Sequence, residues 1–300
     1  MSKQEPQIWL IGCKGMLGTE LSLLLQKTGL AFTGTDRDVD ITNPAALVEF
    51  VKSRPFAWII NCAAYTAVDK AEDDIETCRR LNAVGPGNIA ACAKSVGARL
   101  IHLSTDYVFD GKGIVADGIA RPYREDDTAY PVSVYGRTKR DGEIAVLENP
   151  RSYIIRTAWL YGKYGPNFVA TMLRLMNERT GVKVVNDQQG SPTWAGDLAA
   201  TIVEIINAES CGRPIPYGVY HYTNQGGITW FEFAREIYAQ SRTLGLVKKD
   251  CAVNPCTTAE YPTRAPRPAY SVLDKTKIET ALGIVIPPWN ESLRRYLRAE

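Results

Sequence analysis

Tyr135 and Lys139 are the two residues of this 300-residue sequence best suited to acid–base chemistry. They stand four positions apart, so on a helix they share one face and lie one turn from each other. An ammonium beside a phenol favours the phenolate, which lowers a tyrosine pKa that is normally about 10. The pair could serve a general acid, although the same spacing also arises by chance as a surface pair.

Three glycines follow the first apolar run of the chain, residues 8–11. Their spacing is Gly-x-x-Gly-x-x-Gly, and an amphipathic segment from Glu20 to Lys27 follows at once. Strand, tight turn and helix in this order are typical of a dinucleotide site, where the helix start offers free N–H groups to a pyrophosphate. Glycines also mark ordinary turns, which is the alternative. The turn residues expected at a cofactor are Gly12, Gly15, Met16, Leu17 and Gly18.

A second apolar run, residues 30–35, ends in Asp36-Arg37, about twenty residues beyond the glycines. An acid at this place accepts from the 2′-hydroxyl of NAD, whereas an arginine can hold the 2′-phosphate of NADP. Because both residue types are present, the choice of cofactor stays open. Asp40 and Ile41 are expected to belong to the same part of the site.

The run from Trp58 to Asn61 predicts a third strand, and Ala63, Ala64 and Tyr65 follow it. Small side chains there would let a cofactor lie flat against the backbone. A long helix is then predicted over residues 73–96, with Asn82 near its middle. Because Asn prefers caps to helix interiors, Asn82 is either an exposed polar residue or the donor of a buried hydrogen bond near the site.

A fourth strand over residues 99–103 leads into Thr105, and alternating strands and helices predict an α/β fold with a Rossmann-like, doubly wound parallel sheet. Ligands bind beyond the carboxyl ends of such strands, so Gly12, Asp36, Ala63 and Thr105 are expected to converge on one crevice. We predict a dinucleotide-binding domain over residues 1–158.

Residues 159–300 are expected to form mainly a smaller, substrate-binding lobe, with parts of 182–225 returning to the first domain. Pro- and Gly-rich joints separate helices predicted near 167–179, 194–208 and 229–242.

Composition limits the function classes. Lys and Arg number 35 against 33 Asp and Glu, so no basic face for nucleic acid is indicated. No apolar run is long enough for a membrane span, and residues 1–7 are polar, which leads us to expect a cytoplasmic protein. The seven cysteines are scattered and only His102 and His221 accompany them, so a His/Cys metal site is not expected.

With these residues assembled, the chain resembles the extended short-chain dehydrogenase/reductase family, and within it the dTDP-4-dehydrorhamnose reductases. The resemblance covers nearly the whole chain. Its more specific motifs are residues 61–72, 104–111, 135–139, 156–162, 189–193 and 261–268.

The resemblance implies reduction of the C4 ketone of dTDP-4-dehydro-6-deoxy-L-mannose to dTDP-L-rhamnose, with NADPH or NADH as cofactor. It assigns Tyr135 as proton donor to the C4 oxygen. Lys139 would bind the nicotinamide ribose and depress the Tyr135 pKa, and Thr105 would hydrogen-bond the keto oxygen. A dTDP-sugar is thus the expected partner, and a homodimer is compatible with the family.

The same resemblance places Asp106 and Trp159 against the sugar. An indole can cover the apolar face of a deoxysugar, although a core aromatic next to a strand is an equal alternative for Trp159. Arg264 and Arg267 lie in a basic, Pro-rich run and could pair with the substrate diphosphate; a solvated loop is the alternative, and it fits Arg267 less well.

Two other reactions of this family and one non-catalytic role are alternatives to the reduction. A 4,6-dehydratase needs an Asp-Glu pair after the threonine, but Tyr107 follows Asp106 here, so simple reduction is favoured. A nucleotide-sugar 4-epimerase keeps the same triad and is not excluded by it. A competitor from another class is a non-catalytic, NADP-binding regulatory subunit of the methionine adenosyltransferase type.

Two departures from the family pattern affect these expectations. The segment from Lys112 to Tyr123 is a few residues longer than expected, which could alter a lid or the partner contacts and leaves the identity of the substrate more open. Some members bind magnesium through glutamates, and Glu20 matches one such position. Because Gly196 stands where a second carboxylate is expected, with Asp197 adjacent, we do not expect a metal.

Overall fold

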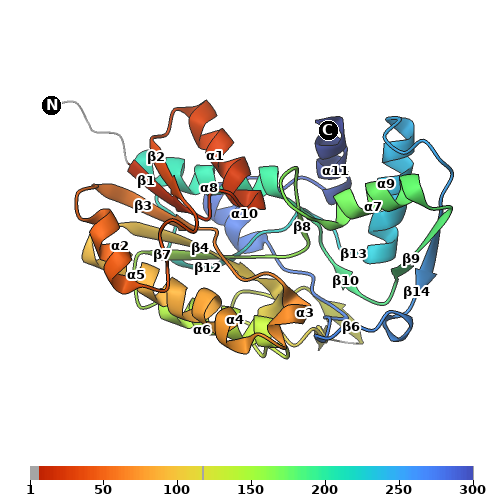
Figure 1. Ribbon diagram of the computed structural model, residues 1–300, viewed down its shortest axis with the longest axis horizontal. Coiled ribbons are helices and arrows are strands. Elements are labelled where there is room, and N and C mark those ends of the chain that lie inside the picture. Colours follow the sequence, from red (N-terminus) through yellow and green to blue (C-terminus); the bar gives the residue numbers. More distant parts are fainter. Residues whose placement is uncertain (1–6, 117, 300) are drawn as a thin grey trace.

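The computed structural model describes residues 7–116 and 118–299 (Figure 1). The predicted polar N-terminal segment therefore lies, except for Gln7, outside the described residues. Six parallel strands form the central sheet, in the order β12-β7-β4-β3-β1-β2. Their bounds are β1 (Gln7–Ile11), β2 (Phe32–Thr35), β3 (Phe56–Asn61), β4 (Arg99–Thr105), β7 (Ser152–Thr157) and β12 (Gly218–His221). The predicted α/β class and parallel sheet are confirmed.

Helices cover both faces of this sheet, as Figure 1 shows. One face carries α1 (Met16–Thr28), α8 (Ala195–Ser210) and α10 (Thr276–Leu282), and the other carries α2 (Pro44–Val51), α5 (Gly85–Ser95) and α6 (Val134–Val146). Helix α1 begins at Met16, four residues before the predicted segment. Asn43 caps α2, since its side chain accepts from the N–H groups of Ala45 and Ala46.

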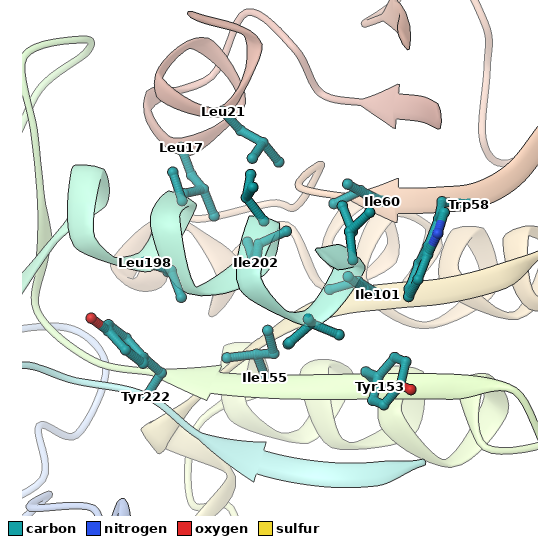
Figure 2. Packing of buried hydrophobic residues seen from close by; sticks show 14 of the residues in the cluster. Leu17, Leu21, Trp58, Ile60, Ile101, Tyr153, Ile155, Leu198, Ile202 and Tyr222 are labelled. Atoms are coloured by element: carbon teal, nitrogen blue, oxygen red, sulfur yellow. The ribbon is translucent and has the colours of Figure 1, made fainter. Parts of the chain in front are cut away.

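The larger hydrophobic core lies between the sheet and the α1/α8 layer. Figure 2 shows Leu17 and Leu21 of α1 facing Leu198 and Ile202 of α8, with Ile101 of β4 beneath them. Each of these side chains is buried, and full burial of such a side chain stabilises the fold by roughly 1.5–3 kcal/mol. This packing fixes the start of α1, and thereby the glycine turn, relative to the strand ends.

The strand order places a topological switch point next to β1. Strand β2 pairs with one side of β1 and β3 with the other, so Ile11 is in register with both Thr35 and Asn61. The loops that leave these strand ends therefore diverge and leave a crevice between them. In open α/β sheets this is where ligands bind.

A second group of elements lies beyond the carboxyl ends of the strands (Figure 1). It consists of β8 (Leu160–Tyr161), α7 (Phe168–Glu178), β9 (Gly181–Val185), β10 (Gln189–Gly190), β11 (Thr193–Trp194), β13 (Ile228–Thr229), α9 (Trp230–Thr243), β14 (Ala252–Cys256) and α11 (Trp289–Arg298). Buried residues such as Met176, Phe233 and Leu293 give it a core of its own. The division into lobes at residues 1–158 and 159–300 stays a proposal, with α8, β12 and α10 joining the first lobe.

The segment predicted as one long helix over residues 73–96 is interrupted. It consists of α4 (Ile75–Arg79), a π-helical turn η1 (Arg80–Val84) and α5. Pro86 explains the interruption, because a proline has no N–H to donate to the carbonyl of Asn82, four residues earlier. That carbonyl lies against Gly142 of α6, where an added methyl group would come within 2.1 Å of it.

The remaining short elements are α3 (Val68–Ala71), the 3-10 turns η2 (Asp106–Val108) and η3 (Thr258–Glu260), and the hairpin of β5 (Ile114–Ala116) and β6 (Ile119–Arg121). Within the part of the chain that is described, no helix combines the length and apolar character required to cross a membrane.

Candidate active site

A cleft of about 1840 Å³ opens at the carboxyl ends of the central strands. A pocket for one small ligand typically occupies roughly 300–1,000 Å³, so this cleft has room for two ligands side by side. The predicted residues that line it are Gly12, Gly15, Met16, Leu17, Gly18, Asp36, Arg37, Asp40, Ile41, Ala63, Ala64, Thr105, Asp106, Tyr135, Lys139, Trp159 and Arg267. Strand ends far apart in the sequence therefore meet in one place.

The three glycines of the turn after β1 have three different surroundings. Gly12 has a φ of 76° and lies against Ala63, and an added methyl group at Gly18 would come within 2.0 Å of the Gly12 carbonyl. These two glycines are required by the fold itself. A methyl group at Gly15 would meet only the Gly12 carbonyl, at 3.4 Å, so the fold leaves Gly15 free to face the cleft.

The start of α1 has no side-chain cap, because Gly15 occupies the N-cap position. The N–H groups of the first turn and the positive end of the helix dipole are therefore available to an anion. Asp36 and Arg37 line the same cleft just after β2, with Lys14 nearby. Together these groups suit a dinucleotide with its pyrophosphate at α1 and its ribose at Asp36.

Tyr65 is a predicted cofactor residue that the structure does not bring to the cleft wall. Its backbone N–H donates to Asn82 Oδ1 at 2.8 Å, and its carbonyl accepts from Asn82 Nδ2 at 3.0 Å. Asn82 is fully buried in the π-helical turn, which confirms the buried alternative for this residue. It holds the segment after β3 in place from behind.

Tyr135 and Lys139 both lie on the buried face of α6, in the wall of the cleft. Lys139 Nζ donates to the carbonyl of Leu103 at 2.6 Å. Burial lowers the Lys139 pKa to about 8, and the charge of Glu143 acts in the opposite direction. The ammonium is therefore held close to the end of β4.

The predicted lowering of the Tyr135 pKa is wrong for this structure. Burial raises the pKa of the phenol well above its ordinary value, while a hydrogen bond with Thr105 acts in the opposite direction. A phenol with a raised pKa is protonated at neutral pH. The raised pKa also makes Tyr135 a weaker acid, so it can give its proton only where negative charge develops on the bound ligand.

Asp106 is a buried carboxylate beside these groups. Its Oδ1 accepts from Thr105 Oγ1 at 2.9 Å, which orients the threonine hydroxyl. Burial raises the Asp106 pKa to about 6, and the Ser271 and Thr105 hydroxyls oppose this effect only in part. Asp106 and Thr105 therefore form a polar, hydrogen-bonding part of the cleft wall next to Tyr135.

The structure gives Trp159 features of both alternatives, the sugar-contacting indole and the core aromatic. Its indole stacks on that of Trp230 with ring centroids 3.6 Å apart and an interplanar angle of 10°, and both residues line the cleft. One indole face is thus occupied by a core contact. Among the described residues Trp159 is the one non-glycine residue with a left-handed backbone, at φ 48°, which costs about 1–2 kcal/mol.

Arg267 and Arg264 separate in the structure. Arg267 lines the cleft and its Nη2 donates to Asp69 Oδ2 at 2.5 Å, with its Nη1 3.5 Å from the Tyr107 hydroxyl. Arg264 pairs at 2.6 Å with Asp73, and both side chains are largely exposed. The solvated alternative therefore holds for Arg264.

Glu20 makes contacts that do not require a metal. Its carboxylate accepts from the backbone N–H of Lys163, and burial raises its pKa. Asp197 is held by Arg295, Ser292 and Asn224. Across residues 7–116 and 118–299, no cluster of three or more His, Cys, Asp or Glu side chains could hold a metal ion.

The longer segment from Lys112 to Tyr123 forms the β5/β6 hairpin, apart from residue 117, which lies outside the description. Tyr123 anchors it by donating to Asp110 at 2.7 Å and accepting from the N–H of Gly113 at 2.7 Å. None of its described residues lines the cleft.

Several cleft residues were not anticipated from the sequence, among them Lys14, Asp69, Tyr107, Phe168, Trp230 and Ser271. Trp230 carried no local signal, because only the tertiary contact with Trp159 gives it a place in the wall. Asp69 lies in a motif used for the resemblance, yet its partner Arg267 is distant in the sequence.

Comparison with known proteins agrees with this geometry. A family model described as the RmlD substrate binding domain matches residues 6–300. A dTDP-4-dehydrorhamnose reductase from Streptomyces griseus is 46% identical over 289 residues, covering 95% of this chain and 91% of that protein. A probable dTDP-4,6-dihydroxy-2-methyloxan-3-one 4-ketoreductase from Streptomyces antibioticus is 41% identical over 293 residues, covering 95% and 93%.

Among solved structures, a dTDP-4-dehydrorhamnose reductase from Bacillus anthracis in complex with NADP is similar over the whole fold. It has a TM-score of 0.89 and 36% identity, covering 99% of this chain and 100% of that chain. The resemblance inferred from the motifs is therefore confirmed. The chain belongs to the RmlD substrate-binding domain family, together with relatives named dTDP-4-dehydrorhamnose reductase.

Proposed function

We propose that this protein uses NADPH or NADH to reduce the C4 ketone of dTDP-4-dehydrorhamnose, giving dTDP-L-rhamnose. The observation that carries the proposal is the meeting of Tyr135, Lys139 and Thr105 in one cleft with the glycine turn. The names of the relatives and the NADP of the Bacillus anthracis structure support the same reaction.

Thr105, Tyr135 and Lys139 have separate roles in the proposed reaction. The bound nicotinamide supplies a hydride to C4. Tyr135 would hydrogen-bond the C4 oxygen and give its proton to that oxygen as negative charge develops there. Thr105 would donate to the same oxygen once its hydroxyl turns from Asp106 to the substrate. Because the Tyr135 pKa is raised by burial, the nearby Lys139 ammonium is needed to stabilise the phenolate that remains.

The sugar and its diphosphate are proposed to occupy the outer part of the cleft. Asp106 and the free edge of Trp159 would contact the sugar, and Arg267 would pair with the diphosphate. The guanidinium is already directed along the cleft wall by Asp69. The Trp159–Trp230 stack limits the Trp159 contact to the part of the indole that the stack leaves open.

The test is oxidation of NADPH and NADH, followed at the nicotinamide band, with enzymatically prepared dTDP-4-dehydrorhamnose. We expect turnover by the native protein, and loss of nearly all turnover in Tyr135→Phe with cofactor binding retained. Cofactor binding without turnover in the native protein would instead favour the regulatory-subunit alternative. Full activity of Tyr135→Phe would remove the assignment of the proton donor.

A second candidate substrate is a related dTDP-linked 4-keto sugar, because the Streptomyces antibioticus relative is named for one. The 4-epimerase alternative shares the triad as well. Product analysis by NMR separates the three reactions, since the configuration at C4 and the substituent pattern of the ring differ. A homodimer and a cytoplasmic location stay predictions, which light scattering and cell fractionation can test.

A further inference from the structure

Glu143 is a buried charged residue behind the cleft wall, one helical turn beyond Lys139, and the proposed chemistry gives it no role. Its side chain is fully buried on α6. It lies one helical turn after Lys139 and two turns after Tyr135, so the three residues share one helix face.

Four hydrogen bonds fix the Glu143 carboxylate. Its Oε1 accepts from Ser104 Oγ at 2.6 Å and from Arg156 Nε at 2.8 Å. Its Oε2 accepts from Arg156 Nη2 at 2.8 Å and from Arg140 Nη1 at 2.9 Å. Ser104 directly precedes Thr105 in β4, so this carboxylate joins the strand that carries the threonine to the helix that carries Tyr135.

Among the described titratable groups that face Lys139, Glu143 is the one that carries a negative charge at pH 7. These groups are Glu143 on its own helix, Cys78 on α4, Cys62 after β3 and His102 in β4. Tyr135 lies one helical turn before Lys139 on α6 and is neutral as well. Burial raises the pKa of both thiols, to about 12 for Cys62, and lowers that of His102 well below its usual range. All of these except Glu143 are therefore neutral at pH 7.

The charged side chains that hydrogen-bond to Glu143 are cationic, and so is Lys139 one turn away. Arg156 is 2% exposed and Lys139 is 2% exposed, and Arg140 approaches from the surface. Two further carboxylates have other partners: Asp106 acts on Tyr135, and Glu125, whose carbonyl accepts from Arg156 Nη1 at 3.5 Å, accepts with its carboxylate from the N–H of His221. Burying an uncompensated ammonium costs several kcal/mol, which would drive Lys139 to lose its proton.

We propose that Glu143 is a positioning residue for the reduction, which keeps Lys139 in its ammonium form and ties the Thr105 strand end to the Tyr135 helix. This inference rests on the proposed function, in which Lys139 acts as an ammonium. Without the Glu143 charge, burial would favour the neutral amine of Lys139 more strongly.

The first experiment needs no substrate. Proteins labelled with 13C at the lysine Cε are titrated by NMR without ligands, and Lys139→Met identifies the resonance of Lys139. We expect the midpoint in Glu143→Gln to lie at least about one pH unit below that of the native protein. Glu143→Asp keeps the charge at a greater distance and should give a smaller shift. Equal midpoints in all three proteins would overturn the proposal.

The second experiment separates the charge from the tether. In Glu143→Gln the alkaline limb of the kcat profile should move to lower pH, whereas Ser104→Ala should lower kcat about tenfold with the limb unchanged. Full kcat in Ser104→Ala would remove the tether from the proposal, and this outcome is available even when Glu143→Gln does not fold. Absence of turnover in the native protein would count against the proposed function and leave the NMR result standing.

Glu209 provides the matched control. It pairs with Arg99 in a largely buried ion pair, and neither residue lines the cleft. Glu209→Gln should reduce stability as Glu143→Gln does, but it should leave both the Lys139 midpoint and the kcat profile as in the native protein. A shift in Glu209→Gln would show that any lost buried charge has the same effect.

Discussion

Arg267 donates to Asp69 at 2.5 Å in the wall of the cleft, although the two residues are 198 positions apart in the sequence. The other oxygen of Asp69 accepts from the N–H of Ala265 at 3.0 Å. One carboxylate thus holds both the guanidinium and the loop that carries it. We interpret Asp69 as the residue that presents Arg267 to the substrate diphosphate.

Asp69→Ala is therefore expected to raise the KM for the dTDP-sugar about five- to tenfold with little change in kcat, because the lost contact orients binding and not proton transfer. Steady-state kinetics with saturating cofactor measures this. Asp73→Ala, which removes the exposed partner of Arg264, should leave KM nearly unchanged, since such pairs contribute about 0–1 kcal/mol. Equal effects of the two variants would contradict our interpretation.

Gly15→Ala is expected to weaken cofactor binding, whereas Gly18→Ala is expected to destabilise the fold. The methyl group at position 15 meets no close contact in the protein, whereas at position 18 it would lie 2.0 Å from the Gly12 carbonyl. We expect Gly15→Ala to fold with near-native stability and bind NADPH at least about tenfold more weakly, and Gly18→Ala to be strongly destabilised. Thermal unfolding and fluorescence titration with NADPH distinguish the two, and native cofactor affinity in Gly15→Ala would argue against a pyrophosphate at this turn.

Asp36 and Arg37 are expected to favour different cofactors. Asp36→Ala removes the acceptor for the 2′-hydroxyl and the charge that repels a 2′-phosphate, so kcat/KM should shift toward NADPH about tenfold. Arg37→Ala should shift it toward NADH by a similar factor. Initial rates with both cofactors test the pair together, and shifts in the same direction would exclude this placement of the ribose.

Asp106→Asn should stabilise the protein at neutral pH. Because burial raises the Asp106 pKa to about 6, the native state binds a proton more tightly than the unfolded state, and ionisation above pH 6 costs stability. The gain in free energy of unfolding should be about 3 kcal/mol at pH 7 and should vanish below about pH 4. Urea unfolding at several pH values measures it.

Asp187→Asn is the control of opposite sign, since hydrogen bonds from the backbone N–H and the hydroxyl of Thr258 hold the Asp187 pKa below its usual value. Its loss of stability should appear above pH 4 and be small, because the side chain is exposed. A loss of stability for Asp106→Asn at neutral pH would mean that the carboxylate is better satisfied than its burial indicates.

Local sequence patterns were sufficient for the elements that carry the cofactor turn. The apolar run before Gly12 and the helix after it depend on contacts between near neighbours, so spacing alone indicated strand, turn and helix. The interruption at residues 80–84 was not predicted. Pro86 leaves the carbonyl of Asn82 without its helical hydrogen bond, and whether the fold accommodates this depends on the group packed against that carbonyl, which is Gly142 on another helix.

The sequence by itself determined the chemistry available to this protein: a phenol and an ammonium one helical turn apart, a hydroxyl at a strand end and a glycine turn for a pyrophosphate. Tertiary structure alone decided the state of these groups. Burial raises the pKa of Tyr135 and lowers that of Lys139, and Glu143, Asp69 and Trp230 gain their places through contacts with distant segments. The physical reason is that desolvation and long-range contacts depend on the packed environment, which residue spacing does not encode.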